Sequence, residues 1–400
     1  MKKLITLFGC LFLLNSSFAQ SIRDNNVRFT YTQLPSHPIK ANEYSVSIKE
    51  SFKQRNEDSM RVYEQRMMAY QTEVNNAIVA WEAHKKAIDR AHLQAMVQYE
   101  QQVAAGNTAA QMPIKAPYPA LTISSMPEEP LMCKTLDTNA LKKTVQVTGL
   151  NFSESSPACI NLAYEGLVMG EPRMSQKVVN GKTVYEYTIL YSSPVSVEVI
   201  AAGRGVILRE QIQQTITNKS FKTQTFNTQA EFELWWMDNK SITWENLQDQ
   251  AARENTSAIN SYLDERIGFP VKSYNAEIYT IKKDKMSDYA EYETAYEHLR
   301  DALLMLNMPG REFEIKEKVA QAIKLYNSVD VIAKKDRKNK IVNAITYLNL
   351  ANTYLWTNDF ANAELSAKQA ISQSINAYTR AGNALLAIIK DQKQRYEANR

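Results

Sequence analysis

The chain has 400 residues, of which 44% are hydrophobic and 22% charged, which is typical of a folded globular protein of two or three domains. The 47 basic and 43 acidic residues leave a formal charge of +4, so no strong net field is present to hold nucleic acid or an anionic membrane. The 11 glycines and 4 histidines disfavour Gly-rich phosphate loops and metal centres built from several histidines.

Residues 1–19 have the order of a secretory signal peptide: two lysines, an apolar run too short to span a bilayer, and small residues before Ala19. Cleavage after Ala19 removes Lys2 and Lys3 and no acid, which lowers the formal charge from +4 to +2. The alternative is a lipoprotein modified at Cys10. The Ala19-Gln20 junction resembles that of exported proteins of Bacteroidota-type Gram-negative bacteria, and this resemblance implies the periplasm or the cell surface. No later stretch is apolar enough for a transmembrane segment.

Two cysteines, Cys133 and Cys159, remain after that cleavage. In an oxidising compartment such a pair is a candidate disulfide, which would stabilise the fold by about 3 kcal/mol. The alternative is two unpaired buried thiols. Their spacing does not match a metal site, and no metal ligand set is expected.

The alternation of residues 27–49 predicts two short strands joined by a loop. Residues 52–106 then form a helical insertion, because no Gly or Pro interrupts the chain from Phe52 to Ala105. Apolar and small residues recur there at 3-4 spacing, which is typical of a coiled-coil seam. The seam positions are Met60, Tyr63, Met67, Tyr70, Val74, Ala77, Trp81, His84, Ile88, Ala91 and Ala95.

Two arrangements of this insertion are open. A hairpin that turns near Asn75-Asn76 is favoured, because isolated helices of this length are rare in monomers. Alternatively, a single helix of about 80 Å extends outward, and the Pro-rich segment 107–130 returns along it and covers the seam.

Strand patterns resume near Thr144 and recur at short intervals as far as residue 208. Asn180-Gly181 between two apolar runs predicts a type I′ hairpin. We therefore expect an α+β protein in which residues 20–225 form an antiparallel β-sandwich-like domain with the helical insertion. Residues 226–400 are expected to form an α-helical domain, interrupted by a β-like stretch at 271–283 whose place the pattern does not give.

The C-terminal region carries the spacing Tyr347-x2-Leu350-Ala351-x2-Tyr354, followed by Phe360 and regularly spaced alanines. Residues 344–373 therefore resemble a tetratricopeptide repeat, with Tyr in place of the usual first Trp and no closing Pro. The resemblance implies antiparallel helix pairs whose inner helices line a concave groove for peptides.

The resemblance places Leu348, Asn352 and Leu355 on that groove, with Asn352 where a side-chain amide often grips a peptide backbone. The alternative is a repeat used only as packing scaffold.

None of the common nucleophile, zinc, nucleotide or calcium motifs occurs, so neither a catalytic residue nor a cofactor is expected. Trp235, Trp236 and Trp244 cluster at the junction of the β and helical regions. Such side chains could stack on a sugar or anchor a partner, although tryptophans are more often part of a core.

The sequence therefore predicts an exported, non-enzymatic interaction or scaffold protein that binds envelope or secreted proteins through its repeats and its helical spur. A homo-oligomer formed through the spur is a second partner hypothesis. The alternative function is a carbohydrate-binding envelope protein that uses the β domain and the tryptophan cluster. No nucleic-acid partner is expected.

Overall fold

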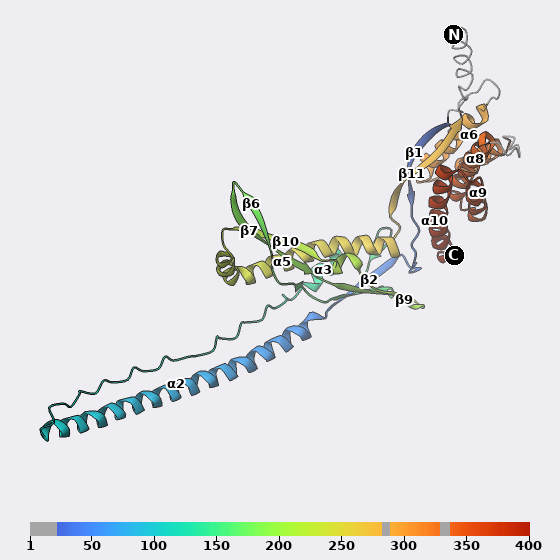
Figure 1. The fold of residues 1–400 in the computed structure, drawn as a ribbon. Helices are drawn as coiled ribbons and strands as arrows, with labels where there is room; N and C mark the ends of the chain where they lie inside the picture. Colours follow the sequence, from blue (N-terminus) through green and yellow to red (C-terminus); the bar gives the residue numbers. More distant parts are fainter. Residues whose placement is uncertain (1–21, 282–288, 329–336) are drawn as a thin grey trace, which may run out of the picture.

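A computed structural model describes residues 22–281, 289–328 and 337–400, so the predicted signal peptide lies outside the described residues. The fold is mixed α and β. Figure 1 shows a long helical spur, a β unit at its base and a helical unit beyond that.

One sheet of the β unit has five strands in the order β3-β2-β4-β8-β9. They are β2 (Glu43–Glu50), β3 (Asn151–Phe152), β4 (Cys159–Tyr164), β8 (Val195–Ala201) and β9 (Gly205–Gln211). Strand β2 runs parallel to both β3 and β4, so the expectation of a wholly antiparallel domain is wrong at this strand. The spur lies between β2 and β3 in the chain and supplies the long crossover that a parallel pair needs.

A second sheet contains β5 (Val168–Met169), β6 (Arg173–Val179), β7 (Lys182–Ser192) and β10 (Lys219–Phe226). Its β6–β7 hairpin confirms the predicted turn, because Val179 pairs with Lys182 and the two residues between them have positive φ. The φ angles are 53° at Asn180 and 76° at Gly181, as a type I′ turn requires. Two short helices, α3 (Thr138–Thr144) and α4 (Gln213–Ile216), also belong to this unit.

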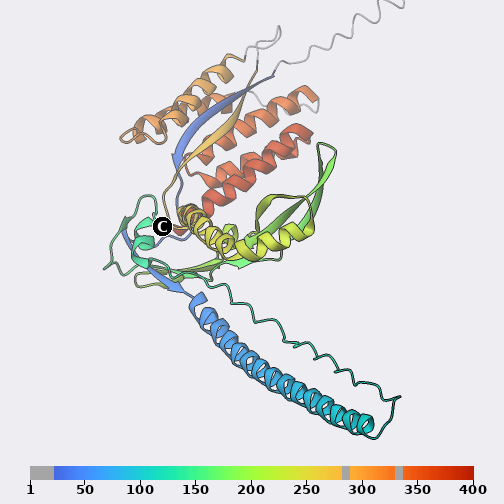
Figure 2. The same cartoon turned by 90° about the vertical axis from the view of Figure 1, so that its left-hand side faces the viewer.

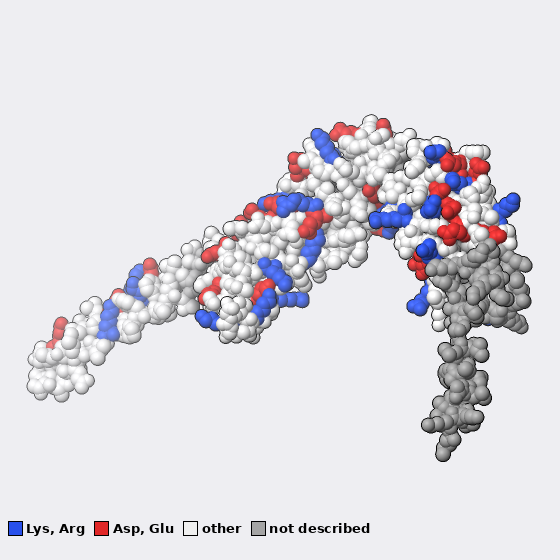
Figure 3. All heavy atoms as spheres, turned by 90° about the horizontal axis from the view of Figure 1, so that it is seen from above, with Lys and Arg blue, Asp and Glu red and all other residues white. Residues whose placement is uncertain are grey.

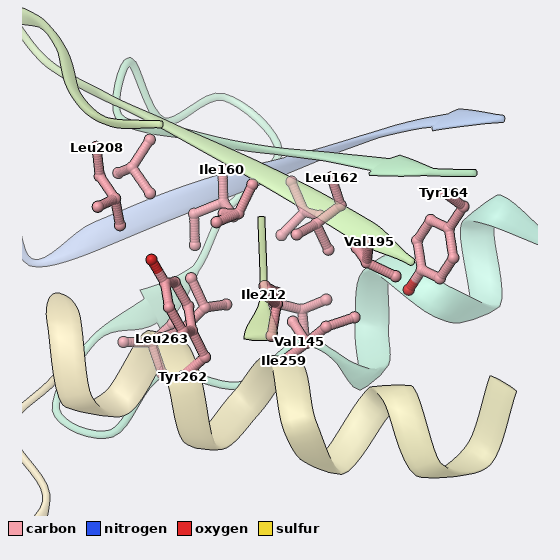
Figure 4. Packing of buried hydrophobic residues seen from close by; sticks show 14 of the residues in the cluster. Val145, Ile160, Leu162, Tyr164, Val195, Leu208, Ile212, Ile259, Tyr262 and Leu263 are labelled. Carbon is pink, nitrogen blue, oxygen red and sulfur yellow. The ribbon is translucent and has the colours of Figure 1, made fainter. Parts of the chain in front are cut away.

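Helix α5 (Gln229–Arg266) packs along the five-stranded sheet (Figure 4). It begins at the N-cap Thr228, whose side chain accepts a hydrogen bond from Glu231 N, and the Glu231 carboxylate accepts one from the N–H of Asn227, the residue before the cap. Ile259 and Leu263 of α5 lie in one buried cluster with strand residues. The hydrophobic cores therefore place α5 with the β unit, whereas the sequence division put residues after 226 in the helical domain.

The helical unit is built around a two-stranded antiparallel ribbon of β1 (Ile22–Thr32) and β11 (Val271–Ile281). The register runs from Ile22 opposite Ile281 to Thr32 opposite Val271, which gives the unplaced β-like stretch its partner. Val27 and Ile278 of the ribbon share a buried cluster with the helices. These helices are α6 (Ala290–Met305), α7 (Glu312–Ser328), α8 (Arg337–Leu355), α9 (Phe360–Ser372) and α10 (Asn376–Ala398).

Arg395 of α10 joins the helical unit to the β unit. Its Nη1 donates to the carbonyl oxygens of Leu34 (3.1 Å) and Glu265 (3.0 Å), and its Nε donates to Asp391 Oδ2 (2.9 Å). The guanidinium also forms an ion pair with the Glu265 carboxylate. Burial raises the pKa of Glu265, but the charges of Arg395 and Lys272 outweigh it and leave the pKa below its usual value. The carboxylate is therefore held ionised at this junction.

The spur is one continuous helix, α2 (Phe52–Ala104) of 53 residues, so the predicted hairpin is wrong. Asn75 and Asn76 are exposed in its middle. The return segment 107–130 runs back beside it, as Figures 1 and 2 show. The side chain of Trp81 donates to Pro119 O (2.7 Å), and Tyr118 OH donates to Asp89 Oδ1 (2.7 Å). The helix is therefore supported by an extended strap rather than by a second helix.

The half-buried stripe of α2 follows the predicted seam from Met60 to Trp81 and then continues through Lys85, Ile88 and His92. His84, placed in the seam by the sequence, is exposed. Along the described part of the spur the stripe faces the extended return segment, so no two-helix coiled coil is present there. The cover is incomplete, because Phe52 at the base is the only fully buried side chain of α2.

The predicted disulfide is wrong, since both cysteines are free. Cys133 Sγ lies 4.0 Å from Leu167 O, just beyond the end of β4, and Cys159 begins β4 and lies 3.2 Å from Asn161 Oδ1. The length of β4 from Cys159 to Tyr164, about 17 Å, separates these two places. A disulfide needs Cα atoms within about 7 Å of each other.

Candidate functional site

One candidate site is an open cleft of about 720 Å³ at the base of the spur. Four separate segments line it: α2, the last part of the return segment, the connection from β5 to β6, and α5. Its size falls in the range of small-ligand sites.

The three predicted tryptophans have different surroundings in the structure. Trp236 and Trp244 line the cleft, but Trp235 does not. Trp244 is buried, and its Nε1 donates to Met132 O (2.8 Å), which anchors the return segment to α5. Trp236 is half-exposed and lies with its ring 6.0 Å from that of Phe232. Trp236 is therefore the tryptophan with a face available to a ligand in the cleft.

Beneath Trp236, an aromatic cluster fixes the start of α5 on the second sheet. The rings of Tyr187 and Phe232 stack at 3.5 Å, and Phe226 packs against both. Trp235 belongs to this cluster, with its ring 5.5 Å from that of Phe226. The alternative, that the tryptophans are core residues, thus fits the buried Trp244 best. Trp235 and Trp236 are both partly buried against this cluster, and of these two only Trp236 lines the cleft.

Charged groups of both signs surround Trp236. Lys240 pairs with Glu128 at 2.6 Å, and the Glu73 carboxylate accepts a hydrogen bond from Ser124. Three other lining side chains have no ion pair or hydrogen bond within the described ranges: Arg66, Glu129 and Glu171. An aromatic face among unpaired donors and acceptors can hold a ligand rich in hydroxyl groups.

Sequence reasoning missed Arg66, Glu129 and Glu171 because they lie on three segments that only the tertiary fold brings together. A local signal was present in the run from Pro127 to Pro130, where two acidic residues stand between prolines.

The predicted groove residues of the helical unit lie under the chain's own strand β11. Leu348, Asn352 and Leu355 are 2%, 5% and 2% exposed. Asn349, one helical position from Leu348, exchanges two hydrogen bonds with the backbone of Tyr279: Tyr279 N donates to Oδ1 (2.9 Å), and Nδ2 donates to Tyr279 O (2.8 Å). A side-chain amide of α8 thus grips an extended backbone, but the backbone is internal.

Asn352 lies one turn further along α8. Its Nδ2 donates to Leu348 O (3.2 Å) and lies 3.5 Å from Glu277 O, while its Oδ1 is buried without a hydrogen-bond partner in the described structure. Leu348 and Asn352 also line a groove of about 590 Å³ between the ribbon and α10, which Leu355 does not reach. Of the predicted groove, only the part next to α10, at Leu348 and Asn352, is therefore open.

The described residues contain no group of three or more histidine, cysteine or acidic side chains placed to hold a metal ion. None of the helices in the same ranges is long and apolar enough to cross a membrane. Comparison with protein-family models gave no match, and comparison with curated proteins gave none either. The resemblance to a tetratricopeptide repeat therefore stays a prediction.

Proposed function

We propose that this protein is an exported, non-enzymatic binding protein that engages a partner protein with the free end of its spur. The observation that carries the proposal is the surface of that end. Leu93, Val97 and Val103 of α2 are at least 46% exposed, and Ile114 of the return segment is 97% exposed. Exposed apolar side chains gathered on one projecting element are typical of an interaction site.

The free end is also nearly uncharged. Between Ala91 and Ile114, Glu100 is the only charged residue, counting His92 as neutral. Figure 3 shows almost no coloured atoms there, whereas the rest of the spur carries both signs. Binding at such a surface depends on apolar burial and amide hydrogen bonds rather than on ion pairs, so it should change little with salt concentration.

The test is chemical cross-linking and co-purification from envelope extracts. Replacing both Leu93 and Val97 with Lys should abolish recovery of the partner, because lysine would bring charge into the contact while preserving helix propensity. Phe313→Lys, at an exposed apolar residue of α7, is the matched control and should leave recovery unchanged. Equal recovery with the double variant, or no partner for the unmodified protein, would contradict the proposal.

The cleft at the base of the spur supports a second candidate function, carbohydrate binding. The supporting observation is Trp236, half-exposed in the same cleft as Arg66, Glu129 and Glu171, which form no ion pair with any residue that the structure describes. Trp236→Ala should abolish glycan binding measured on an array and by calorimetry, since stacking on a sugar needs this ring. Trp235→Ala removes a neighbouring ring outside the cleft and should preserve binding. Equal effects of the two substitutions would count against a sugar site in the cleft.

A further inference from the structure

The hydrogen bonds of β11 show which backbone groups of β1 face away from the ribbon. The N–H of Tyr279 donates to Asn349 Oδ1 and its C=O accepts from Asn349 Nδ2, so the single N–H of Tyr279 is not directed at Asp24, which lies opposite it. In an antiparallel ladder, opposite residues exchange either both hydrogen bonds or neither. The N–H and C=O of Asp24 therefore point away from β11, and by alternation so do those of Asn26, Arg28 and Thr30.

These four residues form an open strand edge. Their side chains are exposed, and β1 pairs with no strand other than β11 in the described part of the chain. Among residues 22–281, 289–328 and 337–400, none of their backbone groups has a backbone hydrogen bond outside the ribbon. A row of unpaired backbone groups is a template for another strand.

We propose that this edge pairs antiparallel with the same edge of a second copy, about a twofold axis at Asn26. The product is a continuous sheet in the order β11-β1-β1-β11. Every backbone group that faces outward at Asp24, Asn26, Arg28 and Thr30 then lies opposite an outward-facing group of the other copy. Each donor N–H therefore meets an acceptor C=O along the contact.

Charge selects this register. With the axis at Asn26, Asp24 of each copy lies opposite Arg28 of the other, so two pairs of opposite charge form. Moving the axis to Asp24 or Arg28 places like charges opposite each other, which is destabilising. Axes at the intervening residues form no Asp–Arg pair. Charges on an edge strand ordinarily prevent pairing. Here an antiparallel copy of Asp-x-Asn-x-Arg reads Arg-x-Asn-x-Asp, so each charge lies opposite one of the other sign.

That self-complementarity is why the inferred partner is a second copy rather than a foreign strand. The contact is independent of the spur proposed above, because β1 belongs to the helical unit and α2 leaves from the β unit. It also depends on charge, so salt should weaken it, whereas binding at the spur should be insensitive to salt.

Sedimentation of the full processed chain over a range of concentrations tests the inference. Asp24→Arg alone and Arg28→Asp alone should each weaken dimerisation at least about tenfold, because opposite charges become like charges. The double variant Asp24→Arg with Arg28→Asp restores opposite signs and should return to within about threefold of the unmodified chain.

Asn26→Pro provides a second, uncharged test. It removes an outward N–H that the monomer does not use, but also the side-chain oxygen that accepts a hydrogen bond from Asn275 Nδ2 (3.2 Å), so Asn26→Ala, which loses only the side-chain bond, is its control. Asn26→Pro should abolish the dimer and Asn26→Ala should keep it. The double lysine variant of the spur should dimerise normally, which separates this inference from the proposed function. A monomer at every concentration would overturn it, as would a dimer indifferent to these substitutions. A foreign strand captured at this edge while the chain stays monomeric would also overturn it.

Discussion

Replacing Arg395 with methionine should uncouple the helical unit from the β unit. The side chain is only 7% exposed and donates to the carbonyl oxygens of Leu34 and Glu265 as well as to the carboxylates of Glu265 and Asp391. Methionine keeps the apolar stem of arginine but none of its five donors. The variant therefore removes the hydrogen bonds of the junction with little change in packing volume.

The expected loss in the free energy of unfolding is about 3 kcal/mol. Each carbonyl left without its donor contributes about 1 kcal/mol. The ion pairs would contribute more if both partners were buried, but Glu265 and Asp391 are 41% and 49% exposed and regain water, so about 1 kcal/mol is assigned to them. For a helical unit that unfolds separately, this loss lowers its melting temperature by roughly 10 °C.

Differential scanning calorimetry measures the effect, with Lys390→Met as the matched control on an exposed position of the same helix. We expect Arg395→Met to lower the temperature of the first transition and to separate it from the second. A shift below roughly 2 °C, or one no larger than that of Lys390→Met, would refute the assignment of Arg395 as the junction between the two units.

Three further results are expected. Asn349→Leu should destabilise the helical unit by about 2 to 4 kcal/mol in urea unfolding, because both backbone groups of Tyr279 lose their partner; a loss below about 1 kcal/mol would contradict this. Gly166→Ala should lower the melting temperature, since the residue has φ +78° and an added Cβ would lie 2.7 Å from a neighbouring sulfur atom, whereas Gly203→Ala in open space is the control for positive φ alone. Hydrogen bonds from Lys115 and Tyr118 lower the pKa of Asp89, so these bonds stabilise the spur above pH 3.8, the ordinary carboxyl pKa, and are lost as the pH falls below that value. Protease sensitivity of the return segment should therefore rise at low pH in the unmodified chain. Asp89→Asn should be equally sensitive at every pH.

Local features of the fold were predictable from the sequence. Asn180-Gly181 specifies its turn because both residues tolerate positive φ, and nothing distant is needed. The 3-4 pattern from Met60 to Trp81 identified the face of α2 that is covered. The pattern did not identify the segment that packs on this face, because either a helix or an extended segment can bury an apolar stripe. The absence of Gly and Pro from Phe52 to Ala105 indicated helix along this stretch but left the hairpin open.

Features that join distant residues were not predictable. Strands β1 and β11 are separated by most of the chain, and neither alternation pattern indicates its partner. The disulfide prediction failed for the same reason, since the position of Cys133 depends on the course of the return segment. In the cleft, Trp236 was singled out by residue type, but the charged side chains around it come from segments with no motif of their own.

The pairing of β1 with β11 also sets an order of events in folding. Asn25 bonds to Thr280 across 255 positions, and synthesis at about 5 to 20 residues per second takes roughly 13 to 50 s to cover that distance. All core residues of the β unit are synthesised during this interval, so that unit can fold, whereas β1 has no strand to pair with until β11 is made. The first strand to be made is therefore among the last to be placed, and it stays open to wrong partners until the ribbon closes.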